Sequence, residues 1–195
     1  MGNSASEIRD TMQVQPIIEL TFPEMLSESS ILNDDQISDL YMSMPAKLQS
    51  QPWRLTYSTD RHGYSFTTMY RRMAVVDGPV LVVVKDFQGG VFGVVTSDPI
   101  VVRPSWYGRT ESFLYSFKPD LRTYGPTFLN DNCIFASPGY LMFGGSRNGQ
   151  PGLLLNDEFC DGSSAMCDTY ANKPLSKSED FLIRSVEMWT FYDQW

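Results

Sequence analysis

The sequence predicts a single α+β domain whose core is a mainly antiparallel β-sandwich flanked by a few helices. Two runs rich in β-branched residues, 79–86 and 91–98, surround a glycine-bearing loop, which is typical of a β-hairpin. Further short apolar runs follow, separated by clusters of Gly, Pro, Asn and Asp. Regular alternation of strands with helices is missing, which disfavours a parallel doubly wound sheet.

The front of the chain divides into an arm and the start of the domain. Residues 1–23 are polar and weakly patterned, so we expect a partly disordered N-terminal arm before a domain over residues 24–195. Asn33 is placed to cap a helix with an acidic first turn, and Pro45 to end it and begin a shorter one. The apolar stripe of the first helix comprises Ile37, Leu40, Tyr41 and Met44.

From residue 53 the pattern changes to strands, interrupted by one helix. Trp53, Leu55 and Tyr57 alternate with other residues and are expected on one face of a strand. Ser65 is placed to cap a helix over residues 65–76, whose shared face comprises Phe66, Met69, Tyr70 and Met73. The unbroken apolar run 80–84 predicts a strand buried on both faces. Later strands are expected within residues 111–117, 133–137, 140–145, 152–157 and 181–191.

Composition excludes several classes of protein. The chain has 195 residues, of which 42% are hydrophobic, so it can build a core as one domain. With 15 basic and 23 acidic residues, it lacks the basic surface of a nucleic-acid binder. No apolar run approaches the length of a membrane helix, and no signal peptide is evident. Three cysteines make a poor disulfide framework, so we expect a cytoplasmic protein.

Nucleophilic catalysis would have to use the single histidine, His62, because a Ser–His or Cys–His pair needs an imidazole base. A solvated turn histidine beside Gly63 is the favoured interpretation. The cysteines, Cys133, Cys160 and Cys167, lack the closely spaced ligand pairs of a zinc site, so we expect no metal and no cofactor. An exposed Cys160 or Cys167 would be open to reversible oxidation only if its pKa were lowered.

Glu111 is the carboxylate that the sequence singles out, because it begins an aromatic-rich strand directly after residues 106–110. If desolvated, it would suit a general acid or base, and an enzyme that uses Glu111 or a cysteine, hydrolytic or peroxide-directed, is the first alternative function. Glu111 would equally pair with Arg109, hold a loop or face a partner. Spacing picks out no second catalytic carboxylate, so binding and structural roles are favoured.

The first residues match the N-myristoylation pattern, with Gly2 as the acceptor and Ser6 at the required spacing. One acyl chain binds a membrane only marginally, and neither a polybasic patch nor a nearby cysteine accompanies it. A myristoylated membrane-surface adaptor is therefore the second alternative function.

Seven segments occur in a characteristic order: 44–48, 52–59, 65–73, 78–86, 91–99, 106–117 and 175–191. Together they resemble the TLDc domain of the oxidation-resistance family, from about residue 32 to residue 191. The resemblance implies a β-sandwich with surrounding helices and a link to protection against oxidative damage. It also implies binding to subunits of the vacuolar proton-pumping ATPase, whose assembly or activity members regulate. No catalytic mechanism is settled for the family.

Glu111 matches the family's glutamate, whereas Arg109 and Thr110 stand where the family has a second glycine. We expect a monomeric, non-catalytic binding protein in the cytoplasm, with peripheral association with lysosomal or vacuolar membranes.

Loops on a rigid scaffold commonly carry binding, so we predict partner contacts at two loops. The first comprises Trp106, Tyr107, Gly108, Arg109 and Glu111. The second includes Gly144, Gly145 and Arg147. Tight turns with only a structural role are the alternative.

Overall fold

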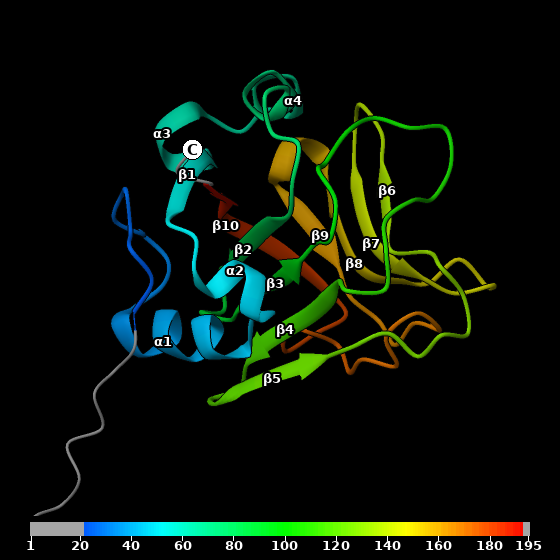
Figure 1. Cartoon of the computed structure of the whole chain (residues 1–195). Coiled ribbons are helices and arrows are strands. Elements are labelled where there is room, and N and C mark those ends of the chain that lie inside the picture. The colour runs from blue at the N-terminus through cyan, green and yellow to red at the C-terminus, as the bar shows by residue number, and fades with distance from the viewer. Residues whose placement is uncertain (1–21, 193–195) are drawn as a thin grey trace, which may run out of the picture.

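The computed structural model describes residues 22–192 (Figure 1). Helices and strands follow one another as α1 (Asp34–Ser43), α2 (Ala46–Gln49), β1 (Trp53–Ser58), α3 (Thr59–His62), α4 (Phe66–Met73), β2 (Val80–Asp86), β3 (Val91–Val95), β4 (Phe113–Phe117), β5 (Leu121–Tyr124), β6 (Ile134–Ala136), β7 (Leu141–Gly145), β8 (Pro151–Asn156), the 3-10 turn η1 (Asp157–Phe159), β9 (Asp161–Ser163) and β10 (Asp180–Phe191). The predicted α+β class, with a mainly antiparallel sheet, is confirmed.

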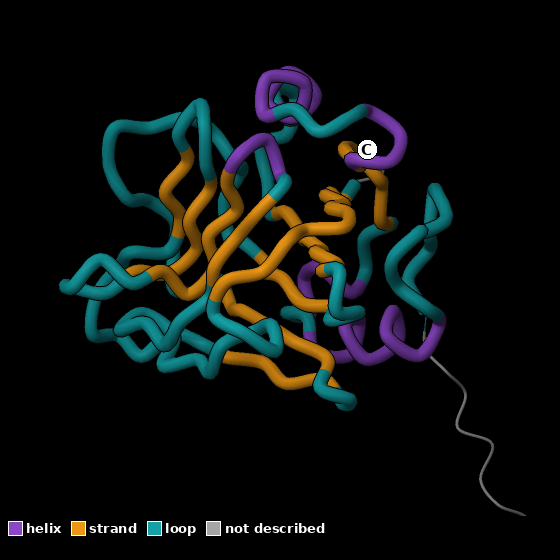
Figure 2. The backbone as a smooth tube through the Cα atoms, turned by 180° about the vertical axis from the view of Figure 1, so that it is seen from behind, coloured by secondary structure: helices purple, strands orange, loops and turns teal. Residues whose placement is uncertain are grey.

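The strands form one antiparallel sheet in the order β5-β4-β3-β2-β10-β9-β8-β7-β6, with β1 also paired to β10. The long strand β10 joins the two halves of this sheet. Its first residues pair with β9, whereas residues from Ile183 onward pair with β2 and those from Glu187 onward with β1. Helices α1, α2 and α3 lie beside the half that contains β1 and β2 (Figures 1 and 2), whereas Tyr70 of α4 donates a hydrogen bond to the Ser137 carbonyl after β6 at 2.6 Å.

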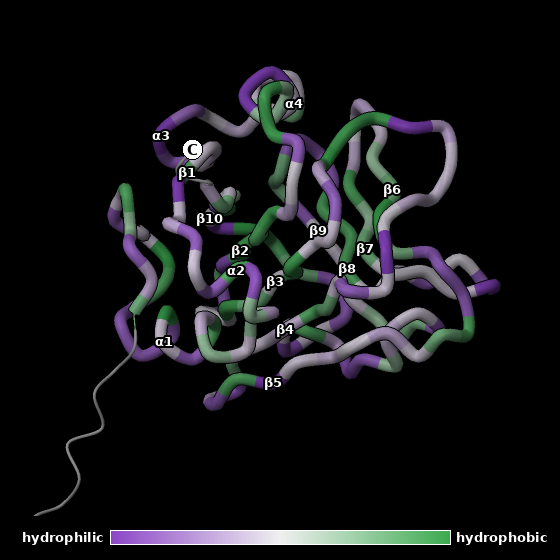
Figure 3. Tube along the Cα trace, viewed as in Figure 1, coloured by the Kyte–Doolittle hydropathy of each residue, from purple (hydrophilic) through white to green (hydrophobic). Residues whose placement is uncertain are grey.

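Two hydrophobic clusters lie on opposite faces of the β2–β4 half. The larger one brings Val82 and Leu114 together with residues of β6–β8 such as Phe143, so it fills the space between the two halves. The smaller one brings Leu81 and its neighbours under Leu40 of α1. Alternate residues of β2 therefore enter different clusters, as predicted for a strand buried on both faces, and Figure 3 shows the apolar run at the centre of the molecule.

The helix caps occur where the sequence places them. Asn33 and Gln36 form a reciprocal capping box at α1, and Ser65 accepts a hydrogen bond from the Thr68 amide at α4. α4 ends at Met73, three residues before the predicted end, and is followed by a turn in which the Val76 amide donates to the Met73 carbonyl at 2.9 Å.

The predicted common face of Trp53, Leu55 and Tyr57 is wrong. Trp53 packs in the smaller cluster, whereas Tyr57 packs in the larger one. The cause is a register shift between Leu55 and Tyr57, where β1 carries an extra residue opposite β10. A bulge of one residue moves every following side chain to the other face, and a local alternation pattern does not reveal it.

The N-terminal arm predicted over residues 1–23 lies almost wholly outside the described residues, as does the lipidation candidate Gly2. The boundary between arm and domain therefore stays a prediction. Within residues 22–192, no helix is long and apolar enough to cross a membrane.

Candidate functional site

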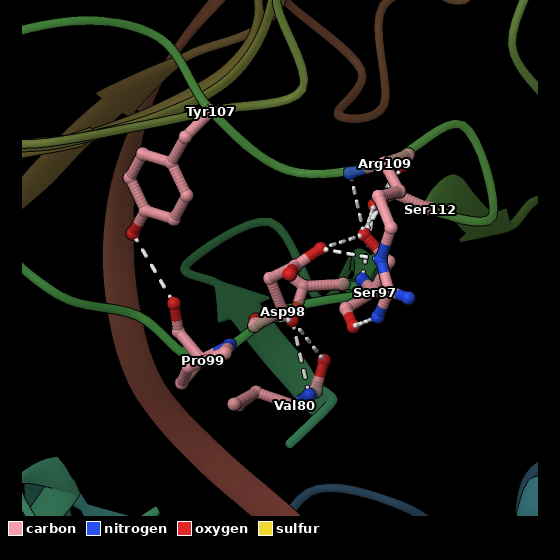
Figure 4. A network of polar contacts seen from close by, with 8 residues as sticks. Val80, Ser97, Asp98, Pro99, Tyr107, Arg109 and Ser112 are labelled. Carbon is pink, nitrogen blue, oxygen red and sulfur yellow. Dashed lines mark hydrogen bonds and ion pairs between the residues drawn. The ribbon is translucent and has the colours of Figure 1, made fainter. Parts of the chain in front are cut away.

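The segment that contains Trp106 and Tyr107 is bound to the second half of the sheet. Tyr107 and Ile134 form a β-bridge, with backbone N–H to O distances of 3.0 and 2.8 Å. The Tyr107 hydroxyl accepts a hydrogen bond from the Val101 amide at 2.9 Å. It also lies 3.3 Å from the carbonyl oxygen of Pro99 (Figure 4). Burial raises the pKa of Tyr107, so it stays a neutral hydroxyl that ties this segment to residues 99–101.

A polar network fixes the next residues of the same segment (Figure 4). The Arg109 guanidinium forms an ion pair with Asp98 at 3.2 Å and donates to the Ser97 carbonyl at 3.0 Å. The Arg109 amide donates to the Ser97 hydroxyl oxygen at 2.8 Å, and the Ser97 amide donates to the Ser112 hydroxyl oxygen at 3.0 Å. Ser97 and Asp98, which follow β3, therefore hold the backbone between Gly108 and Ser112 in place.

Glycines bring the two predicted loops into contact. Gly108 has φ +98°, and a Cβ there would meet Cys133 and Ile134 at 3.1–3.2 Å. A Cβ on Gly145 would lie 2.8 Å from the Trp106 indole, which also packs edge-on against Phe135. Since a larger residue at position 145 would displace the indole, Gly145 positions the first loop on the second.

The second loop is held by the segment between β9 and β10. Gly144 has φ +76° and no room for a Cβ, because Tyr170 and Cys167 lie 2.6–2.8 Å from that position. The Gly145 amide donates to the Thr169 hydroxyl oxygen at 3.0 Å, and the Arg147 amide donates to Asp168 at 3.1 Å. This support is not evident from the sequence, because Thr169 and Asp168 belong to no motif and reach the loop only through the fold.

We call residues 106–111 and 144–149 together the rim. Tyr107 and Gly108 are half-buried, and Gly144 and Gly145 are buried, whereas the side chains of Arg109, Glu111 and Arg147 are exposed. Trp106 is half-buried between these groups. Five of the eight predicted residues thus build the rim, and the three charged side chains face solvent.

The domain that contains the rim is similar to known proteins. A model of the TLDc domain matches residues 25–192. This chain belongs to the TLDc domain family. It is similar to nuclear receptor coactivator 7 of Gallus gallus, with 39% identity over 169 residues, and to oxidation resistance protein 1 of Homo sapiens and of Xenopus tropicalis, each with 38% identity over 169 residues.

These alignments cover 87% of this chain but only 18% or 19% of the relatives. The chain therefore spans about a fifth of the length of the curated relatives it matches. The family resemblance seen in the sequence is confirmed.

Glu111 of this TLDc domain does not pair with Arg109, because the guanidinium binds Asp98 instead. Its carboxylate is exposed and forms no hydrogen bond or ion pair within residues 22–192. The desolvation that a general acid or base at this position would require is therefore missing.

The cysteines and the histidine of the TLDc domain are separate features. Cys133 and Cys167 are buried, and burial raises the pKa of both thiols, so Cys167 does not meet the condition of an exposed thiol with a lowered pKa. Cys160 is exposed. His62 ends α3, where Nδ1 accepts from the Ser58 amide at 3.0 Å. In the part of the chain that the structure describes, no group of three or more His, Cys, Asp or Glu residues is placed to hold a metal ion.

The imidazole Nε2 of His62 lies 2.5 Å from the Arg72 guanidinium, so both ring nitrogens are occupied. Desolvation, followed by the charges of Arg72 and Arg61, lowers the pKa of His62. His62 is therefore a half-buried helix-end residue, not the freely solvated turn residue that the sequence suggested.

Proposed function

We propose that this TLDc domain is a non-catalytic protein-binding module that contributes to protection against oxidative damage by binding and regulating the vacuolar proton-pumping ATPase. In this proposal it acts as a monomer in the cytoplasm and peripherally on lysosomal or vacuolar membranes. Membership of the family supports the proposal, and two of the relatives carry the name oxidation resistance protein 1.

The observation that carries the proposal is that the rim presents exposed charged side chains on a backbone held by hydrogen bonds. Arg147 and Glu111 are exposed, while hydrogen bonds from beneath fix the backbone that presents them. A partner that docks here does not have to order the loops, so little of its binding free energy is lost to conformational entropy. Regulation would follow if the rim bound one state of the ATPase more tightly than another.

The test is capture of ATPase subunits from the native cytosol by the immobilised protein, quantified by mass spectrometry. Wild type should retain subunits of the cytosolic sector, and both Glu111→Gln and Arg147→Glu should retain less. Glu24→Gln is the matched control, because Glu24 is also exposed but lies on the segment beside β1. Failure of the wild type to retain any ATPase subunit contradicts the proposal. Unchanged capture by Glu111→Gln, together with loss of a measurable turnover, would favour an enzyme.

A further inference from the structure

A groove of about 660 Å³ lies between α2, β1, the connection from α4 to β2, and the end of β10. It shares no lining residue with the rim. The floor includes Thr56 and Thr190, whose hydroxyl oxygens are 2.8 Å apart across the β1–β10 pair. Its volume lies within the range of about 300–1,000 Å³ that is typical of ligand sites.

The charge of this groove is opposite to that of the protein. Lys47, Arg54 and Arg72 line it, against one acidic residue, Asp77. The whole chain carries a net charge of -8, with more acidic than basic residues, so an even distribution would make the groove acidic. The local excess of positive charge creates a potential that attracts anionic groups.

The three cations carry charge that described side chains do not neutralise. Within residues 22–192 the one ion pair joins Arg109 to Asp98, so none of the groove cations is neutralised by a described carboxylate. The Arg54 guanidinium lies 4.8 Å from the centre of the Tyr192 ring, which orients it without cancelling its charge. Arg72 contacts His62, whose lowered pKa keeps the imidazole neutral at neutral pH.

The groove also has an apolar side. Leu55, Val75, Val76 and Phe191 line it, and Val75 is 88% exposed. A free inorganic anion would not use these side chains, and a flat lipid surface would not fill a concave site between two strands and two helices. A polypeptide segment with both acidic and apolar side chains uses both kinds of lining residue.

We infer that this groove, defined by Lys47, Arg54, Arg72, Leu55, Val76 and Phe191, binds an extended acidic segment of a partner protein, in which carboxylates alternate with apolar side chains. The identity of that partner rests on the proposed function, whereas the chemistry of the groove does not.

Fluorescence anisotropy with a labelled peptide of sequence Glu-Val-Glu-Leu-Glu-Val-Glu tests this inference directly. The full chain should bind the peptide, and affinity should fall as salt is raised, because the cations are near the surface. The Lys47→Glu/Arg54→Glu double variant should weaken binding at least about tenfold. Arg122→Glu is the matched control, because Arg122 is exposed on β5, outside the groove, and its variant should bind within about twofold of wild type.

Three results would overturn the inference: no peptide binding, equal binding of a peptide with glutamine in place of glutamate, or equal loss in the control. Binding of phosphatidylserine vesicles that depends on Lys47 and Arg54, without peptide binding, would assign the groove to a membrane and also overturn it. In the capture experiment, normal retention of ATPase subunits by the double variant would exclude the ATPase as the partner bound in the groove and would leave the proposed function standing. Charge-dependent peptide binding without any ATPase capture by the wild type would support the groove assignment and contradict the proposed function.

Discussion

Replacement of Glu187 by glutamine tests how the segment before α1 is attached to the sheet. Glu187 lies on β10, is 1% exposed, and accepts four hydrogen bonds. One carboxylate oxygen accepts from the Ser30 amide at 2.7 Å and the Ser30 hydroxyl at 2.8 Å. The other accepts from the Ser29 hydroxyl at 2.6 Å and the Trp189 indole at 3.1 Å. A buried carboxylate with only donors around it is a strong attachment point.

The size of the effect follows from the donors. A glutamine has one acceptor oxygen, so its NH2 group must face either the Trp189 indole N–H or the Ser30 amide. A buried donor without an acceptor costs about 1–3 kcal/mol, and exchanging a charged acceptor for a neutral one weakens each remaining bond by about 1 kcal/mol. Relief of carboxylate desolvation offsets part of this loss. We expect Glu187→Gln to lower the free energy of unfolding by about 2–3 kcal/mol, or roughly 5–10 °C in Tm.

Urea denaturation at neutral pH measures this change, and limited proteolysis locates it. Cleavage should increase first in the segment before α1, because that segment loses its attachment to β10. Glu179→Gln is the control, since Glu179 is exposed, and it should stay within about 0.5 kcal/mol of wild type. A Glu187→Gln protein with the stability and protease pattern of the wild type would refute the reasoning.

Three further predictions concern stability and access. Gly93→Ala should abolish soluble expression, since its Cβ would lie 1.9 Å from the Val82 carbonyl oxygen; a folded variant by circular dichroism would contradict this. Stability should fall as pH drops below about 6.5, because burial, followed by the charges of Arg72 and Arg61, lowers the folded-state pKa of His62, so the unfolded chain binds the proton more tightly. Urea midpoints that show the same loss in His62→Gln would contradict that origin. Maleimide should label Cys160 in the native protein and the two buried cysteines only after unfolding, which mass spectrometry checks; rapid native labelling of all three would be inconsistent with the structure.

The sequence predicts local features of this fold well, because their physical causes are local. Asn33 and Ser65 are caps because their side chains reach amides three residues ahead. The β2 strand is recognised from its short unbroken run of apolar β-branched residues, and the β4 residues from their alternation with a period of two. The bulge between Leu55 and Tyr57 is not recognised, since it depends on pairing with β10, more than a hundred residues later.

The candidate site shows the same division between local and distant causes. The two loops are recognisable as glycine-bearing turns, but their contact through Trp106 and Gly145 exists only in the folded chain. Arg109 has a carboxylate two residues away in sequence and one eleven residues away, and it binds the distant one, Asp98. Backbone geometry decides this, because the Arg109 amide already bonds to Ser97 and places the guanidinium beside Asp98. Proximity in sequence therefore misassigns the partner.

An acidic protein that docks through a cationic groove gains orientation as well as affinity. The net charge of -8 repels an acidic segment from most approaches, while the groove that contains Lys47 and Arg54 attracts it. Repulsion elsewhere on the surface therefore favours a single docking pose, in the same way that like charges suppress wrong partners at protein interfaces. Once the groove is engaged, the rigid rim would contact whatever part of the partner that pose places beside it. Orientation by the groove and discrimination by the rim would then be separable contributions, because the two surfaces share no residue.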